Sequence, residues 1–152
     1  MQREITGLRW VKALTGRPGC VPVGKPRGIK AKGVRFEGAC ATQWPEAAHG
    51  VWWEYEDSNG HGYAQTDLLW RQGGGVIIGE AKLTWRWEAY VQLRKLYFPL
   101  LQGAFGVPVG GVVICRNVTR ETPRAEVVGN LSEALDRARE GRMIPTLHVP
   151  LL

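Results

Sequence analysis

The stretch GYAQTDLLWRQGGGVIIGEAK, residues 62–82, contains the two segments on which the predicted fold depends. The run that ends at Trp70 and the run VIIGEAK are short and rich in aromatic or β-branched residues, and three glycines separate them. We therefore predict two adjacent strands, the second of them buried. Side chains alternate along a strand, so Glu80 and Lys82 point to the same face of the second strand.

The residues before this stretch predict a further strand and a helix. The run GVWWEYED, residues 50–57, is followed by Asn59-Gly60, and Asn-Gly between two such runs is a strong hairpin signal. Upstream, GVRFEGACATQW, residues 33–44, has apolar residues at roughly helical spacing, and Pro45 stops the pattern. We expect a short first helix and then a meander of three antiparallel strands.

The residues after the stretch predict a long helix, a strand and a shorter helix. Thr84 can cap an amphipathic helix that starts at Trp85 and is bent or ended near Pro99. Residues 107–118 indicate another buried strand. Asn130 and Glu133 resemble a capping box for a helix that Gly141 closes. The tail TLHVPLL, residues 146–152, is expected to add an edge strand.

These elements predict one α/β domain in the order helix, three strands, helix, strand over residues 33–118. A chain of 152 residues with 44% hydrophobic content suits a single core. Residues 15–32 are dense in Gly, Pro, Lys and Arg, which disfavours regular structure. We therefore expect residues 1–32 to form a basic, Gly/Pro-rich amino-terminal arm and residues 33–152 to form the domain.

Composition limits the partners and the place of action. The formal net charge is +6, which favours an anionic partner, although a basic segment can also serve only to keep a protein soluble. No apolar run approaches the roughly 20 residues that span a bilayer, and residues 1–10 lack the apolar stretch of a secretory signal. We expect a cytoplasmic protein that does not bind membranes.

Cysteine and histidine do not indicate a zinc site or a disulfide framework. The three cysteines have no CxxC spacing, and the three histidines lack spacing such as HExxH. We interpret the cysteines as reduced thiols. The residues concerned are Cys20, Cys40, Cys115, His49, His61 and His148.

The acidic residues of the stretch predict a metal site. If the two strands pair, Asp67 and Glu80 converge, and the usual relief of their repulsion is a shared proton or a divalent cation. Mg²⁺, for which Mn²⁺ would substitute, suits these carboxylates and a strand carbonyl such as that of Ala81. Lys82 would then hold the attacking water or stabilise charge on a phosphate. The alternative is that Glu80 and Lys82 form an ordinary exposed ion pair.

The pattern Asp67-x12-Glu80-Ala81-Lys82, on two adjacent predicted strands followed by an amphipathic helix, resembles the PD-(D/E)xK nuclease superfamily. Its members share a restriction-endonuclease-like αβββαβ core with a mixed central sheet flanked by helices. Thr66 stands where the family name has proline, a position that is loosely kept. The resemblance covers residues 33–118 and implies an Mg²⁺-dependent deoxyribonuclease with catalytic Asp67, Glu80 and Lys82.

The resemblance extends to the first helix. Many members carry a small-x-x-aromatic-Glu pattern there, which Gly33-Val34-Arg35-Phe36-Glu37 matches. This implies that Glu37 is a further catalytic residue that reaches the metal directly or through water. The alternative is a solvent-facing helix glutamate.

Within the superfamily, the chain looks most like archaeal-type Holliday junction resolvases, including those carried by phages, which act in DNA recombination and repair. Such enzymes are homodimers that cut four-way junctions, and a phage-encoded one acts in the host cytoplasm. Trp52, Trp53, Trp85 and Trp87 are candidates for a dimer patch or for the core. The expected DNA-binding residues are Lys25, Arg27, Lys30, Lys32, Arg35, Arg86 and Gln92.

Other functions remain open at this point. Gln92 and Tyr97 resemble the glutamine and tyrosine of RecB-like exonucleases, with a spacing that is one residue longer. A restriction-type endonuclease of the same fold is a further alternative, as is a non-catalytic nucleic-acid-binding protein. The carboxylates of Asp67 and Glu80 argue against a pure binder, because they repel phosphate.

Overall fold

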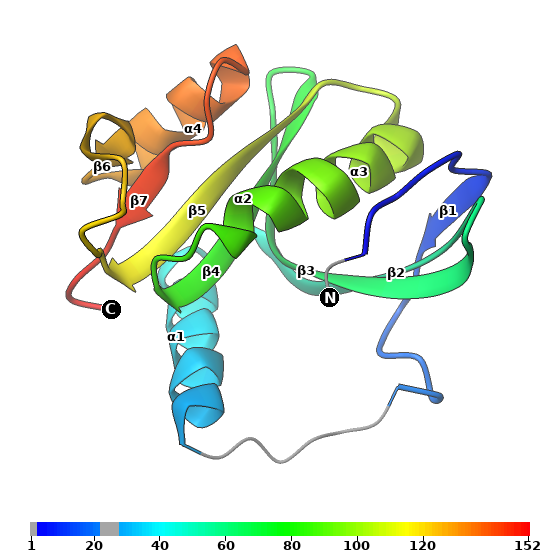
Figure 1. The fold of residues 1–152 in the computed structure, drawn as a ribbon, viewed down its shortest axis with the longest axis horizontal. Coiled ribbons are helices and arrows are strands. Elements are labelled where there is room, and N and C mark those ends of the chain that lie inside the picture. Colours follow the sequence, from blue (N-terminus) through cyan, green and yellow to red (C-terminus); the bar gives the residue numbers. More distant parts are fainter. Residues whose placement is uncertain (1–2, 22–27) are drawn as a thin grey trace.

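The computed structural model describes residues 3–21 and 28–152, and within them seven strands form one mixed sheet with helices on both faces (Figure 1). The strand order is β1-β2-β3-β4-β5-β7-β6, and the α/β fold class is confirmed. The strands are β1 (Trp10–Ala13), β2 (Ala48–Asp57), β3 (Gly60–Gln72), β4 (Gly75–Thr84), β5 (Val109–Asn117), β6 (Val127–Val128) and β7 (Thr146–His148). The helices are α1 (Ile29–Gln43), α2 (Glu88–Gln92), the π-helical segment η1 (Leu93–Tyr97), α3 (Phe98–Phe105), the 3₁₀ segment η2 (Arg124–Glu126) and α4 (Leu131–Glu140).

The central elements follow the predicted order of helix, three strands, helix and strand. Strands β2, β3 and β4 pair antiparallel through two short turns. The helical stretch α2-η1-α3 then carries the chain across one face, so β5 pairs with β4 in parallel. Hairpins can join only antiparallel neighbours, whereas parallel neighbours need a crossover of this kind.

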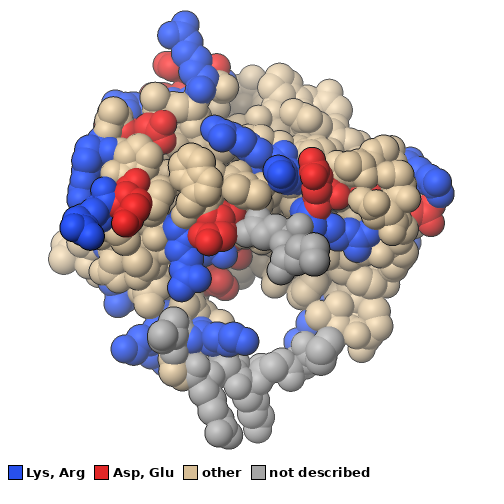
Figure 2. All heavy atoms as spheres, in the orientation of Figure 1, with Lys and Arg blue, Asp and Glu red and all other residues tan. Residues whose placement is uncertain are grey.

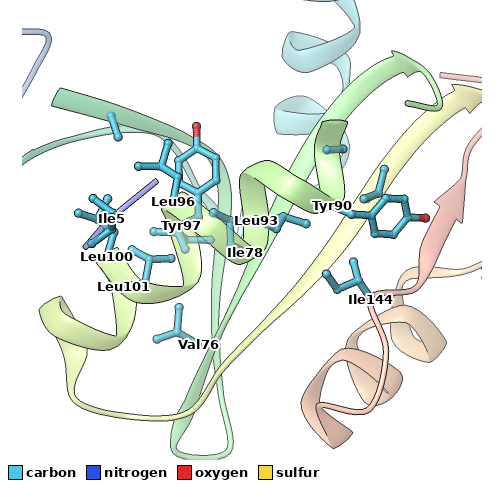
Figure 3. Packing of buried hydrophobic residues seen from close by; sticks show 14 of the residues in the cluster. Ile5, Val76, Ile78, Tyr90, Leu93, Leu96, Tyr97, Leu100, Leu101 and Ile144 are labelled. Atoms are coloured by element: carbon cyan, nitrogen blue, oxygen red, sulfur yellow. The ribbon is translucent and has the colours of Figure 1, made fainter. Parts of the chain in front are cut away.

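Two apolar cores lie on the two faces of the sheet. The helical stretch α2-η1-α3 covers one face, where Leu93, Tyr97 and Leu100 lie beside Ile78 of β4 (Figure 3). Helices α1 and α4 cover the other face with a core that includes Phe36. Within the described residues, no helix is both long and apolar enough to cross a membrane.

The segment before α1 differs from the expected arm. Residues 10–13 form β1, which pairs antiparallel with β2 at the edge of the sheet, and Ile5 is buried in a core. Basic residues of this segment pair with acids of β2: Arg3 lies 3.4 Å from Asp57, Arg9 lies 3.3 Å from Glu56, and Lys12 lies 3.3 Å from Glu54. Residues 3–13 therefore belong to the domain, and acidic side chains of β2 partly neutralise their positive charge.

The long helix also differs from its prediction at both ends. Thr84 is the last residue of β4 rather than a helix cap, and α2 begins at Glu88 without a side-chain cap. Pro99 lies in the first turn of α3 and does not end the helix, because the π-helical segment precedes it. Pro99 has no amide hydrogen to donate to the carbonyl oxygen of Lys95, and the Ile5 N–H donates to that oxygen at 2.8 Å.

The carboxyl-terminal elements combine one confirmed and one wrong prediction. The side chain of Asn130 accepts a hydrogen bond from the Glu133 N–H at 2.9 Å, and Gly141 ends α4 in the left-handed conformation. The tail strand β7 was expected at an edge, but it lies between β5 and β6. The segment η2-β6-α4 leaves the sheet after β5 and returns in parallel, which places β6 outside β7.

Candidate active site

The candidate site lies where two paired strands separate. Pairing between β3 and β4 runs from Gln72 opposite Gly75 to Leu68 opposite Gly79 and stops there. Strand β3 continues along β2, whereas β4 continues along β5 as far as Thr84. Residues 67 and 80 are the first on each strand beyond the last pair, so a fork opens between them.

Side chains take the place of strand pairing in this fork. The Ala81 N–H donates to Asp67 Oδ2 at 2.9 Å, which satisfies a backbone donor that the neighbouring strand no longer reaches. Lys82 Nζ lies 3.3 Å from Glu80 Oε1. The other oxygen, Glu80 Oε2, is buried and has no hydrogen-bond partner within the described residues. The structure thus brings Asp67, Glu80, Ala81 and Lys82 together, and it leaves one carboxylate oxygen unsatisfied.

Burial and mutual repulsion hold these acids away from their ordinary titration range. Burial raises the pKa of Glu80 to about 8, and the charge of Asp67 adds to this effect while Lys82 opposes it. Burial likewise raises the pKa of Asp67 to about 6, against the Ala81 N–H and Lys82. At neutral pH, the pair without a bound metal ion therefore retains a proton even with Lys82 beside it. A divalent cation would displace that proton.

Glu37 approaches the fork from α1. Phe36 and Cys40 anchor this part of the helix in the core, and Glu37 beside them belongs to an exposed stretch. Partial loss of hydration raises the pKa of the Glu37 carboxyl to about 7, and Asp67 adds to the shift while Lys82 opposes it. The described residues contain no group of three or more His, Cys, Asp or Glu side chains close enough to hold a metal.

Two grooves meet at Glu37. The first, of about 530 Å³, is lined by polar or small residues that include Thr42, His49, Gln65 and Asp67. The second, of about 650 Å³, is basic. Its lining includes Lys30, Val34, Lys82, Thr84 and Arg86. Val34 and Glu37 line both grooves, so the acidic fork has an opening on either side.

The expected DNA-binding residues do not form one group. Lys30 and Arg86 line the basic groove, whereas Lys32 and Arg35 are exposed on α1 outside both grooves. Figure 2 shows basic side chains gathered around α1, on the side of the molecule seen in Figure 1. Lys25 and Arg27 lie outside the described residues. Gln92 is half-buried and bonds within the protein.

Gln92 and Tyr97 link the helical stretch to β3. Gln92 Nε2 donates to the Tyr97 hydroxyl at 3.3 Å, and that hydroxyl donates to the Gln65 carbonyl at 2.8 Å. The segment Leu93–Tyr97 is π-helical, so its backbone hydrogen bonds join residues five apart, whereas those of an α-helix join residues four apart. Two residues five apart therefore meet here as residues four apart do in an α-helix. Burial raises the pKa of Tyr97, and the charges of Glu80 and Asp67 add to it, so the hydroxyl stays protonated.

Sequence reasoning missed two polar residues beside the fork. Gln65 lies two residues before Asp67 on the same strand, and this spacing could have identified it. His49 sits opposite Leu68 on β2 and lines the first groove, although nothing around it in the sequence distinguishes it from a surface histidine. Of the thiols, Cys40 and Cys115 are buried and Cys20 is exposed, and all three are free.

Gly50 shapes the strand that carries Asp67. It stands opposite Asp67, where the β2–β3 ladder skips one pair, and its φ of +63° lies in the left-handed region. Ala64 and Leu69 both face the core under α2-η1-α3 although their positions differ by five, an odd number, so the alternation of β3 shifts between them. A left-handed glycine permits such local twisting at little cost.

We expect Gly50→Ala to lower the free energy of unfolding by about 1–2 kcal/mol, because alanine is strained at this φ. Its Cβ would also lie 3.3 Å from Gln65 Nε2. Urea unfolding of Gly50→Ala beside Gly129→Ala measures the effect. Gly129 has open space around its Cα and no left-handed φ, so its replacement should change little. Equal stabilities of the two variants would contradict the role given to Gly50.

Comparison of the chain with protein-family models, with curated proteins and with solved structures found no match.

Proposed function

We propose that this protein is a metal-dependent deoxyribonuclease of the PD-(D/E)xK type, which hydrolyses phosphodiester bonds of DNA in the cytoplasm. The observation that carries the proposal is the fork between β3 and β4. It places the buried carboxylate of Glu80, the half-buried carboxylate of Asp67 and a lysine at one point, with Glu80 Oε2 unpartnered within the described residues. A buried carboxylate oxygen without a donor is costly unless a cation or a proton satisfies it.

The donors at the fork fit Mg²⁺, with Mn²⁺ as a substitute. Carboxylate oxygens of Asp67 and Glu80 and the carbonyl of Ala81 are the hard ligands that Mg²⁺ prefers, and water and phosphate can complete its octahedron. Because Ala81 N–H occupies Asp67 Oδ2, Asp67 Oδ1 and Glu80 Oε2 are the side-chain oxygens that would bind the ion. When bound, such an ion acts as a Lewis acid beside the phosphodiester and lowers the pKa of water at the site.

The protein's own residues orient the substrate. Lys30 and Arg86 attract backbone phosphates into the basic groove, which ends at the fork. The Lys82 ammonium, one-third exposed, reaches from Glu80 toward the same groove and stabilises the charge that develops on the phosphate. Glu37, between the two grooves, orients water. Asp67 accepts the hydrogen bond of the Ala81 N–H and thereby fixes the end of β4.

We expect Lys82→Ala to slow cleavage by about a hundredfold while the protein still binds the metal, since the ammonium acts on the phosphate rather than on the ion. Single-turnover rates with saturating Mg²⁺, combined with calorimetric titration of Mn²⁺, measure the two effects. Lys12→Ala, which alters a lysine on the distant edge strand β1, is the matched control and should cleave normally. A full rate for Lys82→Ala would remove the role of this residue.

We propose branched DNA, in particular the four-way junction, as the first substrate to test, cut by a homodimer. The experiment compares a synthetic four-way junction with a linear duplex of the same sequence, with Mg²⁺ and with a chelator. Metal-dependent cleavage of the junction at symmetric positions is the expected result. Cleavage of both substrates alike would leave a general nuclease, and binding without cleavage under every metal condition would refute the enzyme.

A RecB-like exonuclease is the second candidate, and the π-helical segment favours it. The Gln92–Tyr97 spacing is one residue longer than in that family, but the extra residue of the π-helical turn brings the two side chains within 3.3 Å of each other. An exonuclease needs a free DNA end. Closed circular DNA with the same branch would therefore resist an exonuclease and remain a substrate for the endonuclease.

A further inference from the structure

Trp87 is an exposed aromatic side chain with one supported face. Its side chain is 56% exposed at the point where the chain leaves β4 and enters α2. Its ring lies 5.1 Å from the Tyr90 ring at an interplanar angle of 38°, and 6.4 Å from the Trp85 ring. The supporting rings are themselves buried. Trp87 therefore presents a flat apolar surface to solvent, and two buried aromatic rings support it from below.

Hydrogen bonds fix the supporting rings of Trp85 and Tyr90 to the sheet. Trp85 Nε1 donates to the Tyr90 hydroxyl at 2.9 Å, and that hydroxyl lies 2.7 Å from Thr146 Oγ1 on β7. The Trp85 N–H donates to the Asn117 carbonyl on β5 at 2.8 Å. Because its supports are held by two strands, Trp87 loses little conformational freedom when a flat group stacks on it.

Trp87 directly follows a residue of the basic groove in the chain. Arg86, the preceding residue, lines that groove together with Lys30 and Lys82, and neither Arg86 nor Lys30 has an ion-pair partner within the described part of the chain. Four large apolar side chains are exposed among the described residues, and Val34 lines this same groove. Val34 therefore lies among the cations that would hold phosphate, and Trp87 adjoins one of them, Arg86, in the chain.

Cations along a groove, with an exposed aromatic residue next to one of them in the chain, are a combination that can bind a nucleic-acid strand whose bases are accessible. In a duplex, each base is stacked between its neighbours and cannot reach a protein ring. We propose that Trp87 stacks on an unpaired base of the DNA strand held by Lys30 and Arg86, so that the preferred substrate has unpaired nucleotides next to the cut. This inference rests on the proposed nuclease function and narrows its substrate to DNA that is open at a branch, a flap or a single-stranded end.

The test measures DNA binding in the presence of a chelator, so that no cleavage occurs. One DNA is a splayed-arm fork with 2-aminopurine as its first unpaired nucleotide, and the other is the fully paired duplex of the same sequence. The proteins are wild type, Trp87→Ala, Trp87→Phe and Trp10→Ala. Trp10 is 40% exposed on the edge strand β1 and serves as the matched control.

We expect Trp87→Ala to bind the splayed-arm DNA about tenfold more weakly and to bind the duplex unchanged. Loss of one stacking partner removes a contact with a nucleobase and no contact with phosphate. The wild type should quench 2-aminopurine, Trp87→Phe should retain most of the quenching, and Trp87→Ala should not quench. Trp10→Ala should match the wild type. Equal effects of Trp87→Ala and Trp10→Ala, or an equal loss on fork and duplex, would overturn the inference.

Two further measurements separate this inference from its alternatives. If Trp87 instead forms a subunit contact, Trp87→Ala alone would sediment as a smaller species, and the inference would fall. Cleavage of the splayed-arm DNA by wild type with Mg²⁺ tests the nuclease separately. If Trp87→Ala no longer binds the splayed-arm DNA and none of the proteins cleaves it, the nuclease is refuted and the stacking site is supported. Cleavage of the splayed-arm DNA by wild type, together with unaltered binding of that DNA by Trp87→Ala, would support the nuclease and refute the stacking site.

Discussion

Asp67→Asn and Glu80→Gln are each expected to reduce DNA cleavage by on the order of a thousandfold or more while DNA binding is kept or strengthened. Each change removes one of the two carboxylates that would bind the ion at the fork. Each also removes a negative charge that repels phosphate, which is why binding should not suffer. Cleavage of a branched substrate in Mg²⁺ and anisotropy of the same labelled DNA measure the two quantities.

The control for this pair is Asp136→Asn. Asp136 is exposed on α4, where it pairs with Arg139 at 2.7 Å, and its replacement should leave cleavage unchanged. Normal cleavage by Asp67→Asn or Glu80→Gln would exclude the fork as the catalytic centre. Loss of DNA binding in parallel with cleavage would instead indicate that the variant had lost its fold.

The second large effect concerns stability and pH. The pKa of Glu80 rises from its ordinary 4.5 to about 8 in the folded protein, because burial and then the charge of Asp67 disfavour ionisation. Between these two values the folded chain binds more protons at this group than the unfolded chain does, so stability falls as the pH rises from about 4.5 to about 8. We therefore expect Glu80→Gln, measured with a chelator, to be more stable than wild type at pH 8 by about 2 kcal/mol and nearly equal at pH 5.

Thermal unfolding at the two pH values checks this prediction, and about 2 kcal/mol corresponds to a rise in Tm of roughly 5 °C for a chain of this size. Glu46→Gln, which changes an exposed glutamate, is the control and should show no such gain. Saturating Mg²⁺ should narrow the difference, because it stabilises the wild type. If Glu80→Gln were less stable than wild type at pH 8, burial of the ionised Glu80 carboxylate would not destabilise the folded protein, and the prediction would be wrong.

Local patterns predicted the central elements well. The run VIIGEAK, the hairpin predicted from Asn59-Gly60, whose turn residues are Ser58 and Asn59, and the Asn130 cap are short-range features whose physics is complete within a few residues. Segment 3–14 could not be predicted in this way, because its contacts depend on distant partners. The Ile5 N–H bonds to the carbonyl that Pro99 leaves free, and β1 pairs with β2 across more than 40 residues of sequence.

The candidate site was predictable in part for the same reason. Alternation along β4 put Glu80 and Lys82 on one face, and pairing of the two strands placed Asp67 beside them. The point at which β3 and β4 separate is a tertiary property, since it depends on the twist that Gly50 permits and on β4 following β5. The π-helical turn that joins Gln92 to Tyr97 left no signal in the sequence other than an apparently wrong spacing.

The central claim is that the fork holds a divalent cation between Asp67 and Glu80. The most direct test is diffraction from crystals soaked in Mn²⁺, with data collected at the manganese absorption edge. We predict an anomalous peak within bonding distance of carboxylate oxygens from both residues, and its loss in Glu80→Gln crystals. Saturating Mn²⁺ that produces no peak there, or a peak that contacts neither carboxylate, would contradict the account.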